Sequence, residues 1–88
     1  METRETRLKR LSVRSWRRGT REMDLILGPW AAAHLAGLDD AAAYEALLEE
    51  NDQDLLRWML GQEPPPPAHA PLVARIAAFA RDRLRPRA

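Results

Sequence analysis

The sequence contains no cysteine, only two histidines and few aromatic residues. Without cysteine the chain can form no disulfide, thiolate nucleophile or cysteine-ligated metal site. His34 and His69 lie far apart in the sequence and offer too few ligands for a zinc site or a catalytic dyad. We therefore expect no metal site and no catalytic residues. With neither a nucleophile–base pair nor a metal cluster visible, an independent enzyme is the least favoured class.

Long apolar runs are also missing. No segment approaches the roughly 20 apolar residues that a membrane-spanning helix needs. The arginine-rich start is interrupted by Glu2 and Glu5, which is not typical of an organelle transit peptide, and no secretory signal precedes it. The sequence therefore predicts a cytoplasmic protein without a membrane partner.

Charge is distributed unevenly along the chain, although the net charge is only +1. Residues 1–21 carry a net charge of +6, residues 22–63 a net charge of −9, and residues 64–88 a net charge of +4. Such a layout predicts strong local fields and an electrostatically steered partner. It is equally consistent with intramolecular pairing of the two basic ends with the acidic middle.

No alternating β-branched pattern is present, and Ala, Leu, Arg and Glu dominate the composition. The sequence predicts an all-α fold, a compact bundle of about five short helices in a single domain, residues 1–88. Residues 1–4 and 85–88 are expected to fray, and residues 62–70 to form a proline-rich linker. The predicted helices are 5–18, 21–36, from Asp39 or Asp40 to about Glu50, 53–60 (after an Asn51 or Asp52 cap), and 71–84.

Apolar residues recur at helical spacing and predict the buried faces. Pro29 lies within the second of these helices, so we expect a kink or a division into two helices near Gly28-Pro29. Trp16 and Trp30 are both expected in the core. The predicted inner faces comprise Leu8, Leu11, Ser15 and Trp16; Met23, Ile26, Leu27 and Trp30; Tyr44, Leu47 and Leu48; Leu55, Trp58 and Met59; and Leu72, Val73, Ile76, Phe79 and Ala80.

The segment from Arg17 to Glu22, here called the corner, is where the basic start of the chain gives way to the acidic middle. Gly19 is expected to end the first helix with a positive φ, and Thr20 to cap the second helix. Arg17 and Arg18 then fall in the last turn of one helix, and Glu22 and Asp24 in the first turn of the next, where the helix dipoles favour these charges.

Two interpretations of the corner remain open. The simpler one is a well-capped connection between two helices. The other is a docking surface, because arginine binds carboxylates or phosphates in a bidentate manner and a bare glycine lets another backbone approach closely.

The corner and a second segment resemble the SdhE-type flavinylation factors. The signature Arg-Gly-x-x-Glu of that family reads Arg18-Gly19-Thr20-Arg21-Glu22 here. The second match is Leu47-Leu48-Glu49 followed by Asp52-Gln53-Asp54-Leu55 and then Trp58. The resemblance covers roughly residues 7–63, whereas the proline-rich linker and the last helix match only in character.

The resemblance implies a five-helix assembly factor that is not itself an enzyme. Its partner would be the flavoprotein subunit of succinate dehydrogenase, and in some members that of fumarate reductase. FAD would become covalently attached to a histidine of that partner and would not be bound stably by this chain. The family signature implies that Arg18, Gly19 and Glu22 contact the flavoprotein, and the charges beside them add Arg17 and Asp24 to the predicted partner-binding residues.

Two other function classes compete with this reading. The first is a small basic module that binds nucleic acid through its first and last helices, although the acidic middle and the lack of interleaved aromatics do not favour it. The second is an adaptor or antitoxin-like protein that binds one partner through its ends. A dimer in isolation is consistent with each of them.

Overall fold

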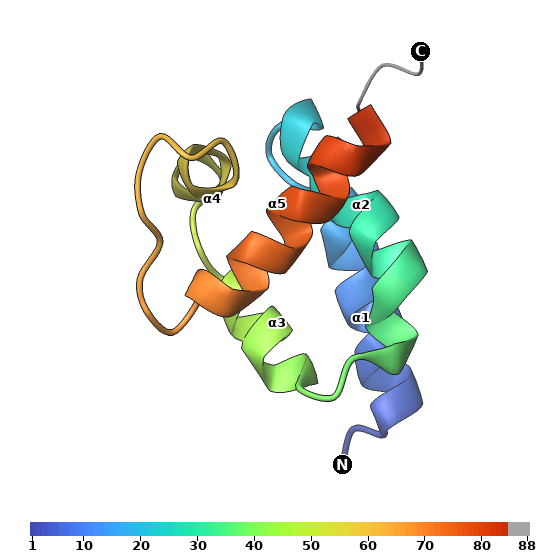
Figure 1. Ribbon diagram of the computed structural model, residues 1–88. Coiled ribbons are helices and arrows are strands. Elements are labelled where there is room, and N and C mark those ends of the chain that lie inside the picture. The colour runs from blue at the N-terminus through green and yellow to red at the C-terminus, as the bar shows by residue number, and fades with distance from the viewer. Residues whose placement is uncertain (85–88) are drawn as a thin grey trace.

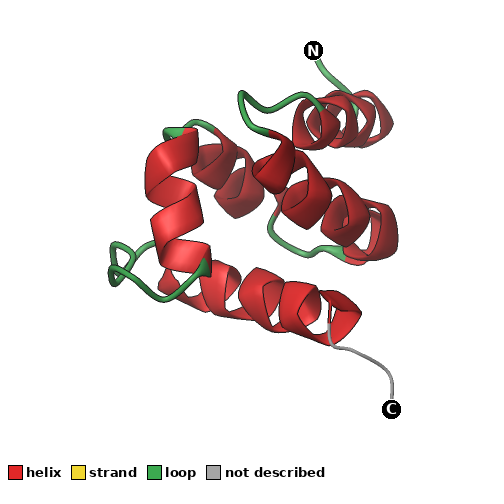
Figure 2. Ribbon diagram, turned by 90° about the horizontal axis from the view of Figure 1, so that it is seen from above, coloured by secondary structure: helices red, strands yellow, loops and turns green. Residues whose placement is uncertain are grey.

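Five α-helices and one short 3₁₀-helix make up the secondary structure of the computed structural model, which describes residues 1–84 (Figure 1). No strand occurs in this range, so the predicted all-α fold is confirmed (Figure 2). The predicted frayed tail, residues 85–88, lies outside the described residues. The elements are α1 (Arg4–Trp16), α2 (Arg21–His34), η1 (Leu35–Gly37), α3 (Ala41–Leu48), α4 (Asp52–Met59) and α5 (Ala70–Leu84).

Side-chain caps fix where the first four α-helices begin. Thr20 accepts a hydrogen bond from the Met23 amide, as the sequence predicts. Where the sequence left two candidate caps, Asp40 caps α3 and Asn51 caps α4. Gly61 follows α4 with a φ of +74° and ends it.

The predicted end of α1 needs correction, and one of the two alternatives predicted for α2 is excluded. α1 ends at Trp16, two residues early, so Arg17 and Arg18 lie in the connection to α2 rather than in a helical turn. α2 runs continuously through Pro29 and is not divided into two helices. Pro29 removes one backbone hydrogen bond, but Leu27 and Trp30 on either side are fully buried and hold the helix in the core.

The core lies where α1 and α2, which form an antiparallel hairpin, meet the other three α-helices (Figure 1). At its centre the rings of Trp30 and Tyr44 lie 5.0 Å apart in a tilted arrangement. Most predicted inner residues are buried, while Leu8, Ile26, Phe79 and Ala80 are only partly buried. No helix within residues 1–84 is both long enough and apolar enough to cross a membrane.

The prediction that Trp16 lies in the core is wrong, because 47% of this residue is exposed. Its ring rests against Gly28 of α2. A Cβ atom at position 28 would lie only 2.4 Å from the Trp16 ring, a distance that real Cβ atoms do not adopt. Gly28 therefore leaves the space in which the Trp16 ring packs between α1 and α2 at the surface.

The proline-rich segment connects α4 to α5 and is fastened at both ends to Trp58. The Trp58 indole Nε1 donates to Glu63 over 3.2 Å, and the ring of His69 lies 5.9 Å from the Trp58 ring. His69 Nε2 also lies 3.4 Å from a carboxylate oxygen of Glu50. These contacts close the linker onto the bundle, and α5 then begins at Ala70, one residue before the prediction.

A series of hydrogen bonds joins Tyr44, Ser15 and the Leu11 carbonyl within the core. The Ser15 hydroxyl donates to the Leu11 carbonyl over 2.8 Å, and therefore accepts from the Tyr44 hydroxyl, 2.6 Å away. Burial raises the pKa of Tyr44 to about 12, because the phenolate would lose its hydration in the core.

This environment predicts an alkaline loss of stability that a simple titration detects. Tyr44 is the only tyrosine, so ultraviolet absorbance of tyrosinate reports on it alone. Between about pH 10 and pH 12, the unfolded chain releases a proton that the folded chain keeps, so the free energy of unfolding falls with rising pH. The absorbance should rise near pH 12 or together with unfolding, whereas in denaturant it should rise near pH 10. A midpoint near pH 10 with intact helicity would contradict the burial argument.

Candidate functional site

Arg18 is the residue that organises the corner. Only 10% of its side chain is exposed, and its Nε donates to Asp52 Oδ1 over 2.7 Å. Its two terminal nitrogens donate to the carbonyls of Leu48, over 2.7 Å, and Glu50, over 2.9 Å. Those carbonyls lie at the C-terminal end of α3, where a helix favours a cation, and Asp52 is the first residue of α4. One guanidinium therefore joins the α1–α2 connection to α3 and α4.

Gly19 is needed at the corner for a reason that the sequence did not reveal. The predicted positive φ is wrong, because among the described residues only Gly61 has one. The Gly19 amide instead donates to Asp52 Oδ2 over 2.5 Å. A Cβ atom at position 19 would lie 2.8 Å from that oxygen. Since Arg18 holds the same carboxylate in place, it cannot easily move aside, and only glycine allows so close an approach.

Asp24 closes the corner from the α2 side. Its Oδ1 accepts the backbone amide of Arg18 over 2.6 Å, and the side chain lies in the first turn of α2. The Thr20 cap lies between them in the chain. Arg18 and Asp24, both predicted to bind a partner, are thus engaged within the fold.

Arg17 and Glu22 have a different environment. Both are exposed, and neither side chain has a hydrogen bond or ion pair with another residue of the described range 1–84. The five predicted partner-binding residues therefore have three different roles. Arg18 and Asp24 fix the shape of the corner, Gly19 permits that shape, and Arg17 and Glu22 present free charges beside it.

Asp52 is the residue of the corner whose role was not predicted from the sequence. The sequence predicted it only as a candidate cap of α4, whereas both of its carboxylate oxygens bind the corner. A signal was present, because Asp52 belongs to the second resembling segment and Arg18 to the first. The two motifs thus form a single structural unit, although they are far apart in sequence.

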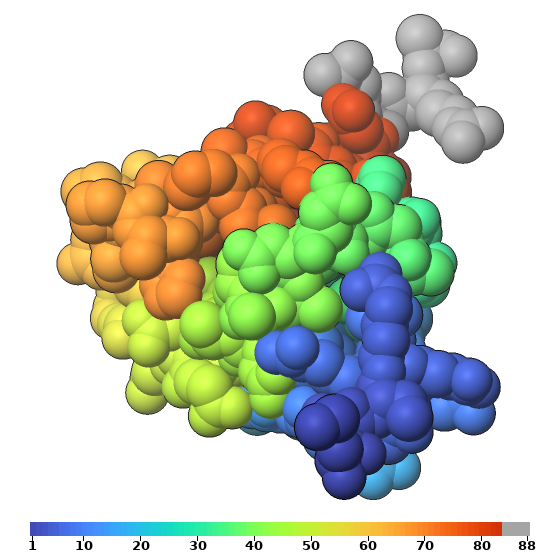
Figure 3. Space-filling model, turned by 90° about the horizontal axis from the view of Figure 1, so that it is seen from below, coloured from blue at the N-terminus to red at the C-terminus, as the bar shows by residue number. Residues whose placement is uncertain are grey.

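The basic side chains of α1 lie against the acidic middle of the chain, and Figure 3 shows this N-terminal segment resting on α3. Arg7 and Arg10 both pair with Glu45, over 2.8 and 2.9 Å, and Arg14 pairs with Glu49 over 2.8 Å. Hydrogen bonds from Arg7 and then Arg10 hold the pKa of Glu45 below its usual value. The charge layout thus reflects intramolecular pairing, which leaves less of a free basic face for nucleic acid.

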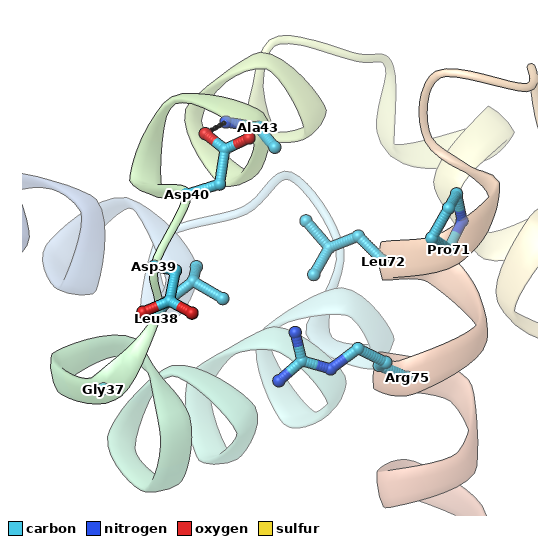
Figure 4. A pocket seen from close by; sticks show the side chains of 8 residues that line it. All are labelled: Gly37, Leu38, Asp39, Asp40, Ala43, Pro71, Leu72 and Arg75. Carbon is cyan, nitrogen blue, oxygen red and sulfur yellow. Dashed lines mark hydrogen bonds between the residues drawn. The ribbon is translucent and has the colours of Figure 1, made fainter.

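A surface hollow of about 240 Å³ lies between the η1–α3 connection and the start of α5 (Figure 4). Leu38 and Asp39 line one side, and Leu72 and Arg75 reach in from α5. The Asp40 carboxylate beside them caps the Ala43 amide. None of the lining residues is a histidine, serine or threonine, so this lining offers no nucleophile–base pair.

Comparison with known protein families identifies the chain's relatives. The family described as "Flavinator of succinate dehydrogenase" (Sdh5) matches residues 9–80, a range that includes both the corner and Asp52. The chain belongs to this family. The Sdh5 match extends through the linker and most of α5, so it covers more of the chain than the motifs alone indicate.

Curated relatives agree with the Sdh5 assignment. The FAD assembly factor SdhE of Pseudomonas aeruginosa is 38% identical over 84 residues, covering 93% of this chain and 95% of that protein. Succinate dehydrogenase assembly factor 2, mitochondrial, of Meyerozyma guilliermondii is 44% identical over 59 residues, 65% of this chain and 44% of that protein. The Mycosarcoma maydis protein of the same name is 39% identical over 67 residues, 74% of this chain and 28% of that protein.

The chain thus spans nearly the whole bacterial relative but less than half the length of the two fungal ones. No solved structure gave a match of comparable significance.

The role of Asp52 can be tested by its stability effect. Asp52→Asn should lower the free energy of unfolding by about 2–3 kcal/mol, because the nearly buried Arg18 loses its charged partner. Asp54→Asn is the matched control. Asp54 lies in the same first turn of α4, but its ion pair with Arg57 is about half exposed, so the loss should stay near 0.5 kcal/mol. Urea denaturation measures both, and equal effects would contradict the role assigned to Asp52.

Proposed function

We propose that this chain binds the flavoprotein subunit of succinate dehydrogenase and promotes covalent attachment of FAD to it. The proposal is supported by membership of the Sdh5 family and by the match to SdhE along nearly the whole chain. The observation that carries it is the corner. There the segment that resembles the family signature forms a turn held by Arg18 and Asp52, beside two exposed charges that have no partner within residues 1–84.

In this proposal the corner residues divide the work. Arg18, Asp24 and Asp52 are positioning residues. Arg18 hydrogen-bonds to both acids and to the Leu48 carbonyl at the end of α3. The exposed backbone at Gly19 lets a segment of the flavoprotein approach closely. Arg17 and Glu22 then pair with a carboxylate and with a basic or amide group of that partner.

The contribution to flavinylation is positional. A rigid surface that binds only one arrangement of the flavoprotein shifts its population toward that arrangement. If the flavin and its acceptor histidine are correctly oriented in that state, bond formation accelerates without any reacting group from this chain. The corner suits this role because Arg18 and Asp52 fix its shape before the partner binds.

We propose that the chain is a helper and not an enzyme, in keeping with the name "assembly factor" that its relatives carry. FAD would be held by the flavoprotein, since this sequence has no glycine-rich phosphate loop between a strand and a helix. By analogy with the bacterial relative we propose a cytoplasmic location. Fumarate reductase as a second client stays a prediction from the resemblance alone.

Glu22→Gln tests the contact without disturbing the fold. Glu22 is exposed and has no polar partner within residues 1–84, so the free energy of unfolding should change by less than about 0.5 kcal/mol. Loss of one charged contact should reduce the yield of covalent flavin about tenfold when the concentration of this chain limits the reaction. The assay mixes purified flavoprotein lacking cofactor with FAD and the chain, and reads in-gel flavin fluorescence after denaturation. The control is Asp39→Asn, another exposed acid; wild-type yield from Glu22→Gln would remove Glu22 from the contact.

Gly19→Arg should abolish both binding to the flavoprotein and the gain in covalent flavin. The new side chain collides with the Asp52 carboxylate and covers the exposed backbone. Gly37→Arg is matched to it, because Gly37 is exposed and a Cβ atom there meets nothing within 4 Å. The Gly37 variant should bind and stimulate as the wild type does. Equal behaviour of the two variants in a binding titration would refute the assignment of the corner.

A further inference from the structure

Large apolar side chains are exposed beside the corner. Five such residues occur in the described range, and three of them are Val13, Trp16 and Leu25, with exposed fractions of 51%, 47% and 55%. We call these three residues the seam patch. The other two are Met1 at the chain terminus and Leu60 at the far end of α4.

The seam patch is continuous across two helices. Val13 and Trp16 are three residues apart on α1 and share one of its faces. The Trp16 ring rests on Gly28 of α2, and Leu25 lies three residues before Gly28 on the same face. Figures 1 and 2 show α1 and α2 packed side by side along this line. The Trp16 ring therefore links the apolar residues of α1 to those of α2.

A groove extends the seam patch toward the other end of the hairpin. It measures about 300 Å³ and is lined mainly by Leu8, Ser12, Ala31, Ala32 and Leu35, with Glu5 and Lys9 among the residues at its rim. Ser12 lies one turn before Trp16, and Ala32 one turn after Gly28. Small side chains on both helices keep the groove open, and the seated Trp16 ring lies at the end nearest the corner.

Charges border this apolar surface on the side of the corner. Arg17 follows Trp16 directly, and Glu22 lies three residues before Leu25 on α2; both charges are free of partners within residues 1–84. An apolar centre with a polar rim is the arrangement of protein–protein interfaces, in which tryptophan and arginine are enriched among the few residues that dominate the binding energy. The surface that the corner presents is thus larger than the motif itself.

We propose that the seam patch and the groove bind an apolar ridge of the flavoprotein subunit, flanked by an acidic group that faces Arg17. This inference rests on the proposed function, because continuity with the corner identifies the occupant. The corner would fix the register of the two proteins through charge, and the seam patch would supply most of the buried apolar area. The motif alone offers little such area, since Arg18 and Asp24 are engaged within the fold.

Two variants test the seam patch without touching the core. Leu25→Glu places a charge at an exposed apolar position, and Leu60→Glu is its control, with a closely similar exposed fraction of 58%. Ala32→Trp fills the groove from an exposed position, and Ala42→Trp on the exposed face of α3 is its control. Both test variants should weaken binding to the purified flavoprotein at least tenfold in a titration, whereas the controls should bind as the wild type does.

Each outcome decides the proposal. If both test variants bind and stimulate flavinylation normally while Gly19→Arg abolishes both, the seam patch is not the contact and the proposed function stands. If the wild-type chain itself does not bind the flavoprotein, the function and this occupant are both wrong. Sedimentation of the chain alone tests the remaining possibility, that a second copy of the chain covers the seam patch. If the chain is a dimer, Leu25→Glu dissociates it, and that variant still binds the flavoprotein normally, the proposal is wrong.

Discussion

The Arg18 guanidinium lies between the negative end of α3 and the first acid of α4, and the rest of the corner depends on that position. It donates to Asp52 and to two carbonyls that no helical amide could satisfy. Because Asp52 is held in this way, its second oxygen can accept the Gly19 amide at short distance. The outer surface of the corner is therefore set by a charge buried behind it.

This arrangement gives a physical reason for the spacing of the two motifs. The first motif provides the guanidinium and the glycine, and the second provides the carboxylate that both of them bind. Neither segment would have this shape alone, since the connection of residues 17–20 is short and carries no regular hydrogen-bonded structure of its own. Binding of a partner to the corner would thus depend on the correct packing of α3 and α4.

Charge and apolar surface have separate roles in the molecule. Most arginines of α1 are used internally against α3, and this pairing fixes the hairpin on the bundle. Arg17 and Glu22, which have no polar partner in the described part of the chain, lie next to the exposed Trp16 and Leu25. The proposed contact therefore combines an apolar centre with a rim of two opposite charges, which favours specificity for one partner over general binding to polyanions.

Apolar spacing and capping residues determined the helices from the sequence alone, because these signals act within a few residues of the chain. The same local signals correctly placed Thr20 at the N-cap of α2, and Glu22 and Asp24 in its first turn. They could not reveal that Arg18 is engaged by Asp52 or that Gly19 is required by that carboxylate, since the contacts span more than 30 residues. Trp16 was misplaced for the same reason, because only the packing of α2 against α1 puts Gly28 under its ring. Local hydrogen bonds and side-chain periodicity thus fixed the elements, whereas the tertiary structure decided which charges remain free for a partner.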